Sequence, residues 1–198
     1  MSRRVVIATG NAGKLAELAR LLAPGGLECV SQVELGVEEA EENGLSFVEN
    51  AIIKARNAAR HTGLAAIADD SGLEVDALNG RPGIRSARFA GPGASDRENV
   101  ERLLAEIEGV DDQARGARFV CVAVYMRHAE DPVPVVCTGS WRGAIARAPR
   151  GSGGFGYDPV FLVPGTGLTA AELPPGRKDE ISHRAKALAC LREHLAGG

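Results

Sequence analysis

The sequence predicts an α/β fold built around a mixed β-sheet. Short apolar strands and amphipathic helices alternate over the first part of the chain, and a strand-rich segment follows them. With 198 residues, 44% of them hydrophobic, the chain is long enough to bury a proper core. The sequence has no internal repeat, linker or low-complexity segment, so we expect one domain, or one domain with two lobes.

Capping signals and apolar spacing place the elements of the first half. Residues 4–8 (RVVIA) predict a short buried strand, and leucines three and four positions apart predict a helix directly after it. A second strand is expected at residues 27–31. The next helix should begin after Ser46, with Glu49 completing a capping box, and it should end at Gly63.

The second half is richer in strands. Residues 64–78 predict a strand, a turn and another strand, and Ser95 begins a helix that reaches Ile107. The segments ARFVCVAVYM and PVPVVCTGSWRGAIA predict two long antiparallel strands joined by a polar turn. Residues 179–195 predict one closing amphipathic helix.

Charge and composition exclude several classes of protein. The net charge is -3 and there is no Lys/Arg block, which argues against binding to nucleic acid or to an anionic membrane. The N-terminus lacks a signal-peptide pattern, and no apolar run approaches the ~18 residues of a spanning helix. We therefore expect a cytoplasmic protein.

The four cysteines predict buried thiols. Cys29, Cys121, Cys137 and Cys190 form no C-x-x-C pair and lie mostly among apolar neighbours. We therefore expect small buried side chains in a reducing compartment, not a zinc site or a disulfide framework.

The segment ATGNAGK joins the first strand to the first helix. It differs from a P-loop, because only two residues separate Gly10 from Gly13 and because Lys14 is followed by leucine instead of a hydroxyl residue. A helix N-terminus with a lysine still favours an anion such as phosphate. The alternative is an ordinary turn with Asn11 as N-cap. If the loop binds phosphate, a metal ion must be held elsewhere.

Two acidic segments could supply that metal site. ADDSG places Asp69 and Asp70 at the predicted carboxyl end of an apolar strand, where ligands gather in open α/β sheets. Adjacent strand residues point to opposite faces, so only one aspartate should face a given cleft. One glutamate of EEAEE could join Asp70 in a Mg²⁺ site. The alternatives are an Asx turn before Gly72 and a solvated acidic loop.

Two further segments carry unusual groups. In GSGGFGYDP, glycines surround Phe155 and Tyr157 and leave the rings little local cover, which favours a flat ligand over core packing. In RKDEISHRAKAL, the cations Lys178, His183 and Arg184 gather at the predicted start of the last helix. Cations are unfavourable at the positive end of the helix dipole, and an anion bound there would offset this repulsion. The alternative to a bound anion is simply a charged first turn of the helix.

Taken in order, these motifs resemble one enzyme family. TGNAGK, ENAIIKA, ADDSGLEVDAL, GIRSARFAG, GGFGYDPVF, TAAEL and ISHRAKAL are similar to the inosine/xanthosine triphosphate pyrophosphatases, from about Val5 to Leu191. These enzymes hydrolyse noncanonical purine nucleoside triphosphates to the monophosphate and pyrophosphate. The resemblance implies an elongated mixed sheet flanked by helices, with two lobes around an active-site cleft, in a single domain of residues 1–198. It also implies dependence on Mg²⁺ and a homodimer.

The resemblance also implies roles for individual residues. Asp70 would accept the proton of the attacking water, and Glu41 and Asp70 would ligate Mg²⁺. The residues expected to bind substrate are Thr9, Gly10, Asn11, Ala12, Gly13, Lys14, Lys54, Ser71, Phe155, Gly156, Tyr157, Asp158, Lys178, His183 and Arg184.

The expected activity is hydrolysis of ITP, dITP and XTP between the α and β phosphates. Two alternatives stay open: a related house-cleaning pyrophosphatase with a different base specificity, and a nucleotide sensor that binds without turnover.

Overall fold

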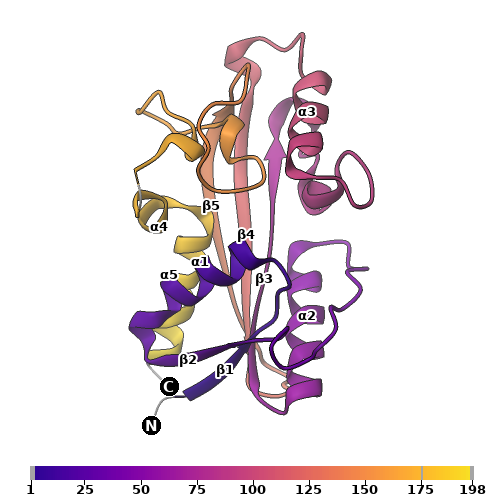
Figure 1. Cartoon of the computed structure of the whole chain (residues 1–198), viewed down its shortest axis with the longest axis vertical. Helices are drawn as coiled ribbons and strands as arrows, with labels where there is room; N and C mark the ends of the chain where they lie inside the picture. The colour runs from indigo at the N-terminus through magenta and orange to yellow at the C-terminus, as the bar shows by residue number, and fades with distance from the viewer. Residues whose placement is uncertain (1–2, 175, 197–198) are drawn as a thin grey trace. The chain divides into compact units, whose positions relative to one another are not determined.

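The computed structural model describes residues 3–174 and 176–196. The ends of the predicted domain, residues 1–2 and 197–198, lie outside this range, as does Pro175. The helices and strands in chain order are β1 (Arg3–Ile7), α1 (Ala12–Leu22), β2 (Leu27–Ser31), α2 (Phe47–Thr62), β3 (Ala65–Val75), α3 (Asp96–Glu106), β4 (Gly116–Met126), β5 (Val135–Ile145), β6 (Phe161–Leu162), α4 (Arg177–Ile181) and α5 (His183–Ala196) (Figure 1).

The strands form one six-stranded sheet in the order β2-β1-β3-β4-β5-β6. Strand β1 is parallel to both β2 and β3, whereas β5 and β6 are antiparallel. The short turn between the neighbouring strands β4 and β5 requires an antiparallel pair, because a parallel pair needs a crossover of a dozen residues or more. The prediction of an α/β fold with a mixed sheet is confirmed.

The chain divides into two compact units, which we call unit 1 and unit 2. Among the described residues, unit 1 consists of 3–70, 121–139 and 183–196, and unit 2 of 71–120, 140–174 and 176–182. Strands β3, β4 and β5 each contribute residues to both units.

In unit 1 the sheet is covered on both faces. Successive residues of β1 alternate between two apolar cores: Val5 and Ile7 pack with α1 and α5, and Val6 packs with α2. Figure 1 shows α1 and α5 on one side of these strands and α2 on the other. Both faces are apolar because both are buried, as is usual for parallel strands.

The same alternation continues along β3, where one prediction was wrong. The strand does not turn at the two aspartates but runs unbroken from Ala65 to Val75. Ile67 belongs to the core under α1 and α5, while Ala66 and Ala68 belong to the core under α2. The aspartates therefore emerge on opposite faces within the strand, and charged partners on each face compensate the burial of each carboxylate.

The predicted helix caps are confirmed. The Asn11 side chain accepts a hydrogen bond from the backbone N–H of Lys14 (2.9 Å) and begins α1. Ser46 caps α2 in the same way, and Gly63 ends that helix with a left-handed backbone at φ 67°. The reciprocal half of the predicted box differs, because the Glu49 carboxylate accepts from the N–H of Leu45 (2.9 Å). Ser95 and Glu98 form a complete capping box at the start of α3 in unit 2.

The predicted closing helix is divided in two. Ser182 takes an extended backbone (φ -69°, ψ 163°), so α4 ends before it and α5 begins at His183. Serine favours such boundary positions because its hydroxyl competes for backbone hydrogen bonds. At Gly139 of β5 any side chain is excluded, since a Cβ would lie 2.0 Å from the His183 carbonyl oxygen. This close approach fixes the first turn of α5 against the sheet.

Unit 2 has a core of its own. Aromatic residues from β4, β5 and β6 meet there, with ring centroids of Phe119 and Phe161 4.5 Å apart and Trp141 5.0 Å from Phe161. Leu103 and Ile107 of the α3 segment are fully buried against the same cluster.

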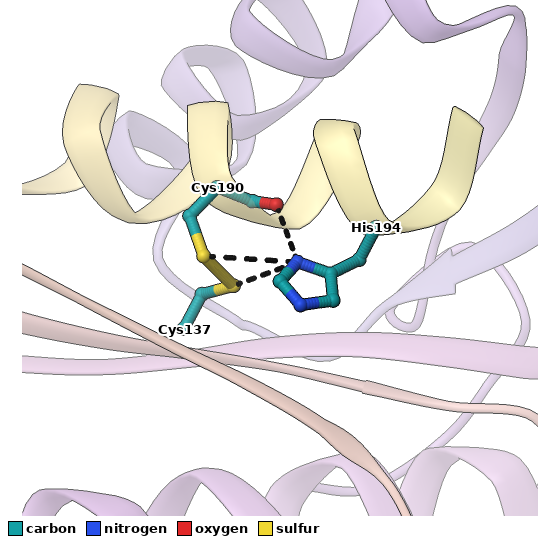
Figure 2. The surroundings of a disulfide bond; sticks show 3 residues. All are labelled: Cys137, Cys190 and His194. Carbon is teal, nitrogen blue, oxygen red and sulfur yellow. Dashed lines mark hydrogen bonds between the residues drawn. A yellow bond between two sulfur atoms is a disulfide. The ribbon is translucent and has the colours of Figure 1, made fainter. Parts of the chain in front are cut away.

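The prediction for the cysteines was half wrong. Cys29 and Cys121 are free thiols, but Cys137 of β5 and Cys190 of α5 form a disulfide (Figure 2). The two residues are 53 positions apart, so no local spacing signals the bond. Of the described residues, none belongs to a helix that is long and apolar enough to cross a membrane.

Candidate active site

The loop between β1 and α1 already holds an anionic group. The backbone N–H of Gly10 donates to the carboxylate of Glu39 (2.8 Å). A Cβ at Gly10 would lie 2.2 Å from the same oxygen, so only glycine allows this approach. The loop is exposed from Gly10 to Gly13, at the N-terminus of α1. Its geometry therefore suits an anion. Asn11 caps the helix, as the alternative expected, and phosphate binding by this loop stays a prediction.

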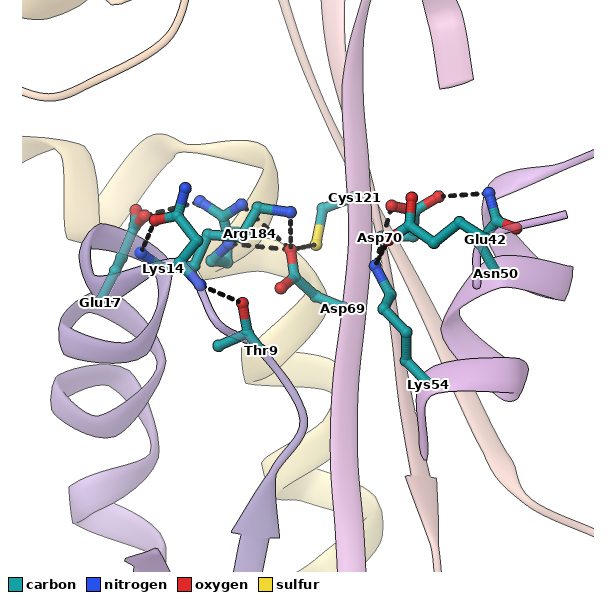
Figure 3. Close-up of polar contacts among 11 residues, drawn as sticks. Thr9, Lys14, Glu17, Glu42, Asn50, Lys54, Asp69, Asp70, Cys121 and Arg184 are labelled. Carbon is teal, nitrogen blue, oxygen red and sulfur yellow. Dashed lines mark hydrogen bonds and ion pairs between the residues drawn. The ribbon is translucent and has the colours of Figure 1, made fainter. Parts of the chain in front are cut away.

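On one face of β3, Asp69 is surrounded by cations. Its Oδ2 accepts from Nε and Nη2 of Arg184 (3.2 and 3.0 Å), and Nζ of Lys14 lies 3.7 Å away (Figure 3). Arg184 also donates from Nη1 to Glu17 of α1 (2.6 Å). Asp69, Arg184 and Glu17 are all buried, so this network ties β3, α1 and α5 together.

The cations decide the ionisation of Asp69. Burial alone would raise the pKa of this carboxyl, but Lys14 and Arg184 together hold the pKa well below its ordinary range. Burial likewise raises the pKa of the neighbouring Cys121 thiol, and the charge of Asp69 adds to the shift. Cys121 is therefore a neutral thiol that donates to Asp69 (3.8 Å between Sγ and Oδ2), not a nucleophile.

On the other face of β3, Asp70 meets residues of α2. Lys54 Nζ donates to Oδ1 of Asp70 (3.1 Å) and to the Glu42 carboxylate (2.8 Å). Asn50 donates from Nδ2 to the second oxygen of Asp70 (3.2 Å). Figure 3 shows this group across β3 from the Asp69 group.

Asp70 differs from Asp69 in its acidity. Burial raises the pKa of Asp70 above its ordinary value; the Lys54 ammonium opposes the shift only in part, and Glu42 adds to it. For Lys54, burial favours the neutral amine, but the carboxylates of Asp70, Asp69 and Glu42 outweigh it and raise the pKa. Lys54 is therefore a charged ammonium next to a carboxylate that is a stronger base than usual.

These carboxylates suit a hard divalent cation. Asp70 and Glu42 both lie within about 3 Å of one ammonium, so their oxygens converge on one position that a positive charge stabilises. Carboxylate oxygens are the ligands that Mg²⁺ prefers, with waters and substrate phosphates completing the octahedron. Glu41, the predicted ligand, is exposed in the loop before α2, and its role stays a prediction.

Sequence reasoning missed Glu17 and Asn50, which contact the two aspartates or their partners. It placed Glu42 only within the acidic segment EEAEE, and Cys121 only among the buried thiols. Asn50 had a usable signal, since it lies one helical turn before Lys54 on the same face of α2. The contact between Glu17 and Arg184 spans 167 positions and had no such signal.

Three of the predicted substrate residues of unit 2, namely Phe155, Asp158 and Lys178, contact one another. Lys178 Nζ lies 2.6 Å from Oδ2 of Asp158 and 4.9 Å from the centre of the Phe155 ring. The backbone N–H of Phe155 donates to the same carboxylate (3.0 Å), and Gly156 donates to Asp96 (2.6 Å). Phe155 and Lys178 are half-buried, so both retain accessible surface for a ligand.

The expectation that Tyr157 is uncovered was wrong. Its ring is buried in the core of unit 2, and its hydroxyl donates to the Ser86 carbonyl (2.8 Å). The glycines around it permit this packing by allowing the chain to turn sharply, as at Gly154 (φ 73°). Ser71 follows Asp70 on β3, and His183 is buried at the start of α5.

The mixed sheet, with two buried aspartates on opposite faces of β3 and an exposed loop at the N-terminus of α1, defines an α/β protein with charged groups gathered around one strand. More specifically, the chain belongs to the Ham1 family, whose model matches residues 5–194. The dITP/XTP pyrophosphatase of Methylococcus capsulatus is 61% identical over 195 residues, which are 98% of this chain and 97% of that protein. The dITP/XTP pyrophosphatase of Escherichia coli O157:H7 is 60% identical over 196 residues, 99% and 100% of the two chains.

The fold is similar to solved structures over its whole length. A HAM1 protein from Coxiella burnetii has a TM-score of 0.91 and 49% identity, and the match covers 99% of this chain and 100% of that one. The resemblance drawn from the motifs is confirmed, and so is the mixed sheet flanked by helices that it implied.

Proposed function

We propose that this protein hydrolyses noncanonical purine nucleoside triphosphates, namely ITP, dITP and XTP, to the nucleoside monophosphate and pyrophosphate. It is a hydrolase of phosphoanhydride bonds. Water attacks the α phosphorus, and pyrophosphate leaves. Its relatives of about 60% identity carry the name dITP/XTP pyrophosphatase, which supports this activity.

One observation carries the proposal: two adjacent aspartates on opposite faces of β3 have different partners, with Lys54 and Asn50 at Asp70, and Lys14 and Arg184 at Asp69. Asp70, with its pKa raised, is a better proton acceptor than an ordinary carboxylate, and we assign it the proton of the attacking water. Asp69, with its pKa lowered, stays ionised and is a poor base. We assign it the task of holding Lys14 and Arg184 in place.

Lys54 orients the proposed base. Its ammonium contacts one oxygen of Asp70, and Asn50 holds the other. Both contacts limit rotation of the carboxylate, so that its position towards the water is fixed before substrate arrives. The positive charge of Lys54 would also attract the negatively charged phosphates of the substrate.

Mg²⁺ is the proposed cofactor. Asp70 and Glu41 would hold it, and Glu42 is a further carboxylate beside Asp70. When bound, the ion would neutralise charge on the triphosphate and on the departing pyrophosphate.

The loop from Thr9 to Lys14 is the proposed phosphate grip. Its Gly10 N–H already binds a carboxylate oxygen, and a phosphate oxygen presents a similar acceptor. Lys14 supplies a full charge at the same helix N-terminus. The predicted contacts of Ser71, of residues 155–158, of Lys178 and of His183 with Arg184 belong to this proposal as well.

Base selectivity should follow from hydrogen-bond donors. Hypoxanthine and xanthine carry an oxygen at position 6, for which His183 and Arg184 are the proposed donors, whereas adenine presents an amino group. Two donors that face each other leave buried groups without hydrogen bonds, which costs roughly 1–3 kcal/mol each. Several such contacts together can give ~10⁴-fold discrimination in kcat/KM. Guanine shares the 6-oxygen and must be rejected at position 2, where its amino group would meet a donor or a tight wall.

A nucleotide panel tests the proposal. Steady-state kinetics with a pyrophosphate readout should give kcat/KM for ITP, dITP and XTP well above GTP, and GTP above ATP. Equal efficiency with ATP or GTP would refute the house-cleaning function. A preference for a modified pyrimidine would indicate the related pyrophosphatase, and binding without pyrophosphate release would indicate a sensor.

We further propose that residues 1–198 work as one catalytic domain, in a cytoplasmic homodimer that binds neither nucleic acid nor membrane. The net charge of -3 without a basic block supports the last point. Sedimentation of the purified protein at micromolar concentration should give the mass of two chains.

A further inference from the structure

A second side-chain cluster lies in unit 1 apart from the two aspartates. It consists of Cys137 on β5 and of Cys190 and His194 on α5 (Figure 2). One ligand-type atom from each residue lies within 4.8 Å of the others. The Nδ1 atom of His194 is 3.9 Å from the sulfur of each cysteine. We refer to these three residues as the Cys2His cluster; none of them is among the proposed substrate or Mg²⁺ residues.

The backbone places the three side chains as in a metal site, with two ligands on one helix face and a third on the strand beneath it. Cys190 and His194 are four residues apart on one helix, so their side chains share a face, and β5 brings the third ligand to that face. In a tetrahedral zinc site, with bonds of about 2.3 Å to sulfur and about 2.0 Å to nitrogen, sulfur and nitrogen lie about 3.5 Å apart. The observed 3.9 Å is close to that separation.

The surroundings favour a bound cation. Cys137 is buried in the apolar core beneath α5, Cys190 is half-buried, and His194 is exposed, so the cluster opens to solvent on one side only. Two thiolates would neutralise a divalent ion in this partly buried position. His194 also lies in the last turn of α5, where the helix dipole favours positive charge.

We propose that the dithiol form of this protein binds one Zn²⁺ ion at Cys137, Cys190 and His194, with a water molecule as fourth ligand, and that the disulfide form does not bind it. A dithiol reductant transfers two electrons and two protons to the disulfide, becomes a disulfide itself and leaves two protein thiols. Zn²⁺ then displaces both thiol protons into solvent.

His194 takes part through a change of tautomer. In the disulfide form its Nδ1 contacts the Cys190 carbonyl oxygen at 2.9 Å, as a donor. On metal binding the ring proton moves to Nε2 through water, and the exposed ring rotates about its side-chain bonds so that Nδ1 turns from the Cys190 carbonyl oxygen towards the two sulfurs and can coordinate. The ring is exposed, so this exchange requires no rearrangement of the core.

Zinc titration tests the proposal. The protein is reduced, separated from the added reductant and kept without oxygen. It then competes with a chromophoric chelator for Zn²⁺, in excess Mg²⁺ so that the carboxylates are saturated. We expect one Zn²⁺ per chain, and at least tenfold weaker binding by the disulfide form, by Cys190→Ser and by His194→Gln. Co²⁺ in place of Zn²⁺ should give a sulfur-to-cobalt charge-transfer band, which Cys190→Ser weakens because only the Cys137 thiolate remains.

Two matched variants control for loss of any cysteine or histidine. Cys29→Ser removes a free thiol on β2, and His61→Gln removes a helical histidine whose Nδ1 also contacts a carbonyl four residues earlier (2.9 Å). Both should bind Zn²⁺ as the wild type does. No zinc binding by reduced protein, equal binding by the disulfide form, or equal losses in the controls would each overturn the proposal. His194→Gln keeps the test decisive if Cys190→Ser does not fold.

Discussion

Asp69 and Asp70 show how two identical side chains acquire different chemistry from their neighbours. Both are almost fully buried, and each contacts cations, yet their pKa values shift in opposite directions. Asp69 meets the charges of Lys14 and Arg184, which outweigh its desolvation. Asp70 meets Lys54 but also the negative charge of Glu42, and desolvation prevails.

Asp70→Asn should abolish most of the turnover. We expect kcat to fall by roughly 10²–10⁴-fold with the fold intact, because the amide cannot accept the proton of water. Asp69→Asn should mainly lower the free energy of unfolding and should lower kcat less than Asp70→Asn does. The reason is that it removes the negative charge that balances the buried guanidinium of Arg184. Pyrophosphate release and urea unfolding of both variants decide between the roles; the reverse pattern would mean that the two assignments must be exchanged.

The stability of the protein at low pH should depend on Asp69. Its pKa in the folded protein lies below the ordinary value of 3.8, so its ionised form stabilises the fold above that pH. This contribution is lost as the pH falls towards the folded-state pKa. We expect the gap in unfolding free energy between wild type and Asp69→Asn to be largest near neutral pH and to narrow below about pH 5. A gap that stays constant from pH 7 to pH 3 would contradict the ionic role.

Among the elements, the loop before α1 is where a substrate phosphate would compete with a carboxylate of the protein for the same N–H group. The Glu39 carboxylate occupies the Gly10 N–H that we assign to a phosphate. Both groups are exposed, so a triphosphate displaces an anion that is held only weakly.

Glu39→Gln should therefore lower the KM for the triphosphate. Removing one exposed negative charge from beside the loop is worth about 0.2–1 kcal/mol, which corresponds to a change of about 1.4- to fivefold. Glu38→Gln, the exposed neighbour whose backbone carbonyl accepts from Asn57, is the matched control and should leave KM unchanged. A higher KM in Glu39→Gln would instead indicate that this carboxylate helps to bind substrate or metal.

The elements also show which features local sequence can predict. The helix starts at Asn11, Ser46 and Ser95 were predictable, because a cap and its partner lie within three residues of each other. Asp70 and Lys54 were both singled out, and they are in contact. The break at Ser182 was missed because the apolar pattern of the last helix passes through it, although serine is itself a boundary signal.

What could not be predicted is contact between distant segments. Glu17 and Arg184 lie 167 positions apart, and the sequence of α1 alone gives Glu17 no role other than a helix former. The unbroken course of β3 depends on charged partners supplied by other elements, so the aspartates looked like a turn. Tertiary contacts override local preference at these positions.

At the scale of the whole molecule, the Cys137–Cys190 disulfide links segments 53 positions apart. A cross-link of this span removes chain entropy from the unfolded state, and the chain-entropy model gives about 4 kcal/mol. Reduction in the presence of a chelator should therefore lower the Tm by several degrees, and Cys137→Ala should have the low Tm under both conditions. Calorimetry with and without reductant checks this, with Cys29→Ser expected to respond as the wild type does.

The uninterrupted strand β3 ties the two aspartates to one register. Deleting or inserting a single residue between Ala65 and Asp69 would turn every following side chain to the opposite face of the sheet. The proposed base would then face Lys14 and Arg184, and its neighbour would face Lys54. Length changes in this stretch should thus be forbidden in evolution, even where substitutions of the small apolar residues are tolerated. A library of functional variants would show this as an absence of insertions and deletions across five residues that otherwise accept conservative change.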